Sequence, residues 1–125
     1  MNSDTSKTVP NICVTADPGI CGFSCTINAR KTGRRMVAVQ IVGSECKQIQ
    51  RLANGLDVMT LQALFLPLTR NPVYVAAEKS GCHPSCAIPA AVLKAMEVAL
   101  DMALPKEVCI QFKSMAEKVQ DRETD

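Results

Sequence analysis

The stretch FSCTINARKTGRRMVAVQIV, residues 23–42, decides the fold class that the sequence predicts. Apolar and polar residues alternate in FSCTINA (23–29), which is the period of a strand with one buried face. MVAVQIV (36–42) is rich in β-branched residues and predicts a second strand, and the polar RKTGRR between them predicts a turn. We therefore predict an antiparallel hairpin. A turn centred near Thr32 would pair residues whose numbers sum to about 64.

Helical signals follow the hairpin. SECKQIQRLANGLD (44–57) predicts a helix that Ser44 caps, with a glycine near its end. DVMTLQALFLPL (57–68) predicts a shorter helix that ends before Pro67. NPVYVAAEKSG (71–81) is ambiguous: its β-branched residues favour a strand, but the Asn-Pro start and the final glycine favour a helix, which we prefer.

The last segments complete the predicted architecture. Residues 89–104 are mostly Ala, Val, Leu and Met, which predicts one central, mostly buried helix. EVCIQFK (107–113) alternates again and predicts a strand. We expect an α+β fold in which a small antiparallel sheet, the N-terminal hairpin plus this C-terminal strand, carries helices on one face. Residues 11–114 would form this single domain, between a flexible tail at 1–10 and a flexible charged tail at 115–125.

Composition excludes several classes of function. The 125 residues include 47% hydrophobic side chains, enough for one packed core. Aromatic residues make up only 3%, which disfavours stacking platforms for single-stranded nucleic acid, and the net charge of +2 is too small for a nucleic-acid face. No apolar run approaches the length of a membrane span or a signal peptide. We therefore expect a cytoplasmic protein without nucleic-acid or membrane partners.

Seven cysteines are the most informative residues. In a reducing compartment such a set is more typical of metal binding or catalysis than of disulfides. The predicted hairpin register places Cys21 beside the end of the second strand, close to Cys46. Cys46 begins a predicted helix, and Cys82, His83 and Cys86 precede another. A helix N-terminus favours a thiolate, which is the form that binds metals.

These positions predict a metal site made of Cys21, Cys46, Cys86 and either Cys82 or His83. The sequence does not distinguish an iron–sulfur cluster from Zn²⁺, and it leaves open which of the two adjacent residues is the fourth ligand. Cys25 shares the apolar face of its strand, so we interpret it as a core thiol. Cys13 and Cys109 lie in short strand-like runs without neighbouring ligands, and we interpret both as structural.

Several motifs resemble a family of small uncharacterised proteins from anaerobic bacteria and methanogens. The resemblance covers roughly residues 19–112 and has a Cys-Gly-Phe, a Ser-x-Cys and a His-x-x-Cys-x-x-Pro element. These elements fall on Cys21, Gly22, Phe23, Ser44, Cys46, His83, Cys86 and Pro89. The family has no established activity, so the resemblance implies no reaction. The layout of the cysteines is also similar to that of IscU-type iron–sulfur assembly scaffolds, an analogy that does not establish function.

Three hypotheses follow for the function. The first is a metal- or cluster-binding protein that acts as a carrier, scaffold or sensor, with a protein partner for metal or cluster transfer, and not as a conventional enzyme. The second is a thiol enzyme that uses Cys86 as nucleophile and His83 as base. The third is an interaction module in which a metal, if one is bound, only holds loops together. The sequence does not fix the oligomeric state.

Overall fold

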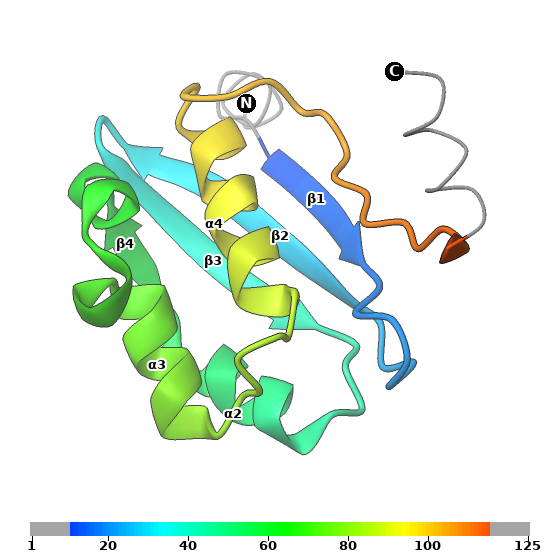
Figure 1. Cartoon of the computed structure of the whole chain (residues 1–125). Helices are drawn as coiled ribbons and strands as arrows, with labels where there is room; N and C mark the ends of the chain where they lie inside the picture. The colour runs from blue at the N-terminus through cyan, green and yellow to red at the C-terminus, as the bar shows by residue number, and fades with distance from the viewer. Residues whose placement is uncertain (1–10, 116–125) are drawn as a thin grey trace.

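A four-stranded antiparallel sheet organises the chain (Figure 1). The computed structural model describes residues 11–115, so the predicted tails lie outside the described residues, apart from Met115. The strands are β1 (Asn11–Ala16), β2 (Cys25–Gly33), β3 (Met36–Val42) and β4 (Val58–Thr60), and they lie in the order β1-β2-β3-β4. The predicted α+β fold with its central hairpin is therefore confirmed, but the first hairpin strand begins two residues later than predicted and continues through most of the predicted turn, to Gly33.

The sheet has one buried and one open face because apolar and polar residues alternate along its strands. The buried side chains of the two central strands are those of Cys25, Ile27, Ala29, Val37, Val39 and Ile41. Their neighbours on the opposite face, such as Arg30 and Gln40, are exposed. The buried face is the one that the helices cover (Figure 1).

Three α-helices form the second layer: α2 (Lys47–Gly55), α3 (Pro72–Ser80) and α4 (Ile88–Ala99). α4 contacts β1, β2 and β3, while α2 and α3 pack against each other beside it. The α4 side chains of Val92 and Met96 are fully buried, and such burial stabilises the fold by roughly 1.5–3 kcal/mol per large side chain. No helix within residues 11–115 is long and apolar enough to cross a membrane.

The buried end of α3 shows why the ambiguous segment 71–81 is helical, as preferred. The Oδ1 of Asn71 accepts a hydrogen bond from the backbone N–H of Val73 (3.0 Å) and caps the helix. The Nδ2 of the same side chain donates to the carbonyl of Ala63 (2.8 Å), so the cap is tied to the preceding segment. Pro72 occupies the first turn, where its missing N–H costs nothing.

The prediction for residues 57–68 is wrong in its first part. Val58–Thr60 form the short strand β4, which pairs with Met36–Ala38 of β3 and satisfies backbone groups at that edge. Two 3₁₀ segments follow, η1 (Leu61–Phe65) and η2 (Leu68–Arg70), and Pro67 separates them. Pairing with a neighbouring strand has overridden the local helical pattern.

The predicted helix 89–104 is confirmed as buried but ends early. It stops at Ala99 because Asp101 adopts a left-handed conformation (φ 61°). The N–H of Asp101 donates to the carbonyl of Val98 (3.1 Å) and that of Met102 to Glu97 (2.8 Å), a Schellman arrangement that closes a helix. Ala103, which the predicted helix includes, lies outside α4 and is exposed.

The predicted strand 107–113 is also wrong. These residues form no regular structure, and all of them are exposed. Alternation alone does not create a strand, because a strand needs a neighbour that takes up its backbone hydrogen bonds. The C-terminal strand of the predicted sheet is replaced by β1 and β4.

Candidate functional site: a group of four cysteines

The register of the β2–β3 hairpin decides which cysteine reaches the end of β3. Thr26 pairs with Val42 and Ile27 with Ile41, so paired residue numbers sum to 68, and the predicted sum near 64 is wrong. Extending the ladder by one residue places Cys25, where β2 begins, beside Gly43. The chain passes from there to Cys46, so Cys25 occupies the position that the predicted register gave to Cys21.

Cys46 stands at the N-terminus of α2, as predicted. It is the N-cap residue, and its thiol donates a hydrogen bond to Oε1 of Gln48 (3.2 Å). Ser44 does not cap the helix; its Oγ accepts the backbone N–H of Cys46 (3.1 Å), and its carbonyl accepts Nε2 of Gln50 (2.9 Å). These bonds fix the approach to the helix, so Cys46 is held at its positive end.

Cys82 is placed by the C-terminus of α3. Gly81 adopts the left-handed conformation (φ 80°), its N–H donates to Glu78 (3.1 Å), and the N–H of Cys82 donates to Ala77 (3.0 Å). The Nε of Arg51 on α2 donates to the carbonyl of Ser80 (3.1 Å) at the same helix end. This bond joins α2 to the C-terminal end of α3, two residues before Cys82.

Cys86 lies in the connection between α3 and α4. Its backbone N–H donates to the carbonyl of His83 (3.0 Å), which forms a turn just before α4 begins at Ile88. The thiol of Cys86 is half-buried, whereas the side chain of His83 is exposed. No hydrogen bond joins the two side chains in the part of the chain that the structure describes.

Electrostatic interactions show that these thiols share one neighbourhood. Burial raises the pKa of the Cys25 thiol, and the nearby thiols of Cys86 and Cys46 raise it further. Burial likewise raises the pKa of Cys82, again with contributions from Cys86 and Cys46, while the cation of Arg51 opposes the shift. Cys25 and Cys82 lie on different elements, and the same two thiols, those of Cys46 and Cys86, affect the pKa of both.

We call Cys25, Cys46, Cys82 and Cys86 the four-cysteine group. Its members come from the start of β2, the start of α2 and the α3–α4 connection, segments that lie at one end of the sheet (Figure 1). Within residues 11–115, however, no three His, Cys, Asp or Glu side chains already form an arrangement that could hold a metal ion.

The other cysteines lie elsewhere. Cys21 is exposed in the connection between β1 and β2, which reaches the same end of the sheet, but its charge is not among those that affect Cys25 and Cys82. Cys25 is buried, as predicted for a core thiol, and yet belongs to the group. Cys13 and Cys109 are both exposed.

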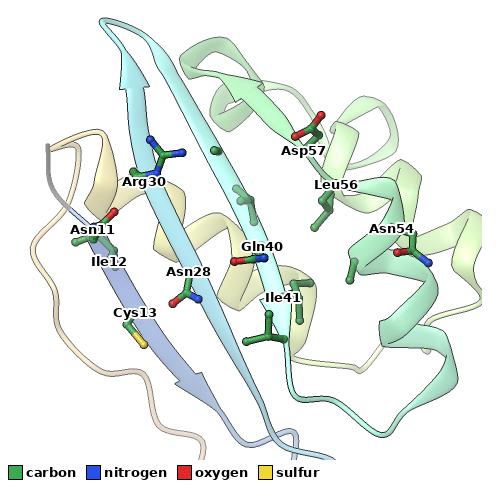
Figure 2. Close-up of a pocket in the computed structure, with 14 residues that line it drawn as sticks. Asn11, Ile12, Cys13, Asn28, Arg30, Gln40, Ile41, Asn54, Leu56 and Asp57 are labelled. Atoms are coloured by element: carbon green, nitrogen blue, oxygen red, sulfur yellow. The ribbon is translucent and has the colours of Figure 1, made fainter. Parts of the chain in front are cut away.

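The open face of the sheet forms a separate surface. Figure 2 shows Asn28, Arg30 and Gln40 standing on it, with Cys13 from β1 at one side and Asp57 at the other. They line an open hollow of about 790 Å³. Cys25 lies on the buried face of β2, so its thiol and the side chain of Asn28 in the hollow are on opposite faces of that strand.

The fold and the group define a small single-domain α+β protein with four thiols gathered at one end of its sheet. The chain belongs to the DUF6951 family, a family of unknown function, whose model matches residues 12–112. No curated protein and no solved structure matches the chain. The predicted resemblance to a family without an assigned activity is thus confirmed at that level.

Proposed function

We propose that this protein binds an iron–sulfur cluster through Cys25, Cys46, Cys82 and Cys86 and acts in the cytoplasm as a carrier, scaffold or sensor. The observation that carries the proposal is the register of the β2–β3 hairpin, which places Cys25 at the end of β3 beside the path to Cys46. Cys46 and Cys86 also contribute to the raised pKa of both Cys25 and Cys82, in agreement with that placement. Four cysteines in one neighbourhood are the ligand set that the common clusters use. A helix N-terminus at Cys46 and the cation of Arg51 offset the negative charge of bound thiolates.

A cluster suits this arrangement better than a single Zn²⁺ ion. Tetrahedral zinc with bonds of about 2.3 Å requires its sulfur ligands to lie roughly 4 Å apart. In a cluster each cysteine binds its own iron, so the sulfurs are spread more widely. Cys46 and Cys86 lie near enough to Cys25 and Cys82 to raise the pKa of both, but no three of the four thiols form a single-ion site in the described residues.

The proposal differs from the set that the sequence predicts. Cys25 takes the place of Cys21, and Cys82 is preferred to His83 as the fourth ligand. Cys21 and His83 are exposed and lie outside the proposed ligand set. An anaerobic habitat, which the family resemblance implies, would suit a cluster that oxygen attacks, and a protein partner would receive or supply the cluster.

Anaerobic purification followed by an absorption spectrum and by iron, sulfide and zinc analysis tests the proposal. We expect a broad visible absorption, with iron and sulfide in equal amounts, in the wild-type protein and in Cys21→Ser. The signal should be lost in Cys46→Ser and Cys86→Ser. Stoichiometric zinc without sulfide would contradict the cluster and indicate a zinc site. Metal-free protein in which Cys86 alone reacts rapidly with an alkylating reagent would favour the thiol-enzyme hypothesis.

A further inference from the structure

The C-terminal segment, residues 107–113, is built like a strand but pairs with no strand within residues 11–115. Its side chains alternate between apolar and polar, and the apolar ones are Val108, Ile110 and Phe112. Their exposed fractions are 61%, 78% and 96%. Three apolar side chains on one side of an extended segment are what a half-buried strand requires, and here that side faces solvent.

β1 offers the complementary feature. It lies at the end of the strand order and pairs only with β2 among the described residues, so its outer edge is an unpaired edge. Ile12 and Val14 lie on the helix-covered face of β1 and are only partly buried, as members of the rim of the core. A strand added at this edge would bury them and would satisfy the free backbone groups.

The two patterns match in length and in face. β1 has six residues, and an antiparallel pairing can set Phe112 opposite Ile12, Ile110 opposite Val14 and Val108 opposite Ala16. All three apolar side chains would then lie on the helix-covered face. The same pairing sets Cys109 opposite Thr15 on the open face, where polar residues already stand. A single register therefore places the apolar side chains on the helix-covered face and Cys109 on the open face.

The direction of the chain indicates where the segment comes from. After α4 the chain runs alongside β1 in the same direction as that strand, without pairing with it (Figure 1). Pairing within one chain would be parallel, which is slightly less stable per residue, in a sheet whose other pairs are all antiparallel. A second copy related by a two-fold axis can present its segment to β1 in the antiparallel direction.

We propose that the C-terminal segment of each chain adds as a fifth strand to β1 of a second copy, and that this reciprocal exchange forms a dimer. Each side contributes seven segment residues and the six residues of β1. Stable interfaces of about 1,600 Å² use roughly 20–30 residues on each side, so this interface is smaller than a standard one. The dimer therefore depends on concentration and dissociates on dilution.

Sedimentation velocity of the full chain over about 1–100 µM tests the dimer, because interfaces of this kind reach the micromolar range. We expect the wild-type protein to shift from monomer to dimer as concentration rises. Phe112→Asp should weaken association at least tenfold. Its side chain is 96% exposed, so the folded monomer is not affected. Leu104→Asp, 85% exposed but outside the segment, is the matched control and should dimerise as the wild type does.

Disulfide trapping tests the register. In a Cys13→Ser, Cys21→Ser background Cys109 is the remaining exposed cysteine. Thr15→Cys would lie about 5 Å from Cys109 between Cα atoms, within the reach of a disulfide. Thr26→Cys is the control, because Thr26 pairs with Thr15 one strand further in and would lie roughly 10 Å from Cys109. Oxidation of mixed ¹⁴N- and ¹⁵N-labelled protein, followed by peptide mass spectrometry, shows whether one chain or two are joined.

A disulfide between differently labelled chains in Thr15→Cys, but not in Thr26→Cys, supports the exchange. A disulfide confined to single chains overturns it, because the segment then closes on its own β1. A wild-type monomer at the highest concentration also overturns it. So does a dimer that Phe112→Asp leaves unchanged, since that dimer uses another surface.

Discussion

Replacing Cys25 separates the contribution of a buried thiol from that of a cluster ligand. The side chain is 4% exposed where β2 begins, opposite Ala16 of β1. Cys25→Ala removes one buried sulfur, and we expect the free energy of unfolding of the metal-free protein to fall by about 1 kcal/mol. Cys25→Ser buries a hydroxyl group instead, so its loss should be larger, about 1–3 kcal/mol if the hydroxyl finds no partner.

Cys21→Ser is the matched control for stability. Cys21 is exposed, so its replacement should change the free energy of unfolding by no more than about 0.5 kcal/mol. Urea unfolding of the chelator-treated proteins measures all three variants. The free energy of unfolding should fall with urea concentration at the same slope in all three variants. An equal slope would show that the substitutions change stability and not the amount of surface exposed on unfolding.

Cluster retention gives the second readout. Loss of an outer partner of a metal ligand weakens binding by about 10–100-fold, so loss of a ligand should cost at least that much. After anaerobic reconstitution we expect Cys25→Ala to retain less than about one tenth of the wild-type iron under competition with a chelator. Cys21→Ser should retain all of it. The opposite pattern, with iron kept in Cys25→Ala and lost in Cys21→Ser, would refute the reasoning from the observed register and restore the predicted ligand set.

Three further outcomes are expected. The metal-free protein should lose stability as pH rises above about 8.5, because the raised pKa of Cys25 and of Cys82 makes the unfolded chain release protons first. Urea midpoints between pH 7 and 10 measure this fall, and Cys25→Ala should reduce it. Gly81→Ala should cost about 1 kcal/mol by placing a Cβ in a left-handed position, and it should lower cluster retention by displacing Cys82. Met96→Ala, at a fully buried position of α4, should cost about 2–5 kcal/mol in thermal or urea unfolding, whereas the exposed Met102→Ala should cost less than about 0.5.

Local pattern was sufficient for the elements that carry their own signal. Alternation identified Cys25, Ile27 and Ala29 as one buried face, and the structure buries all three. The cap at Asn71 and the glycine at 81 correctly favoured a helix between them. Each of these signals acts within a few residues, through side-chain periodicity or a hydrogen bond to the nearby backbone, and so can be read without knowing the rest of the fold.

Local pattern failed wherever a distant neighbour decides the outcome. Val58–Thr60 form a strand because they pair with the edge of β3. Residues 107–113 do not form a strand, since no strand among the described residues pairs with them. Asp101 ended α4 five residues early through a left-handed turn that aspartate, unlike most residues, tolerates. Strand formation depends on a partner, and a sequence does not show which partners are free.

The candidate site shows the same division most clearly. The sequence by itself determined that a hairpin forms, which faces of its strands are buried, and that cysteines stand at the starts of α2 and α4. It could not determine the register of the hairpin. Whether the numbers of paired residues sum to 64 or to 68, each side chain stays on the same face of the sheet, so the alternation of apolar residues does not distinguish the two registers. The two-residue turn at Arg34 and Arg35, with an irregularity between Lys31 and Gly33, selects the second value. That tertiary choice brings Cys25, and not Cys21, to the end of β3 beside the path to Cys46.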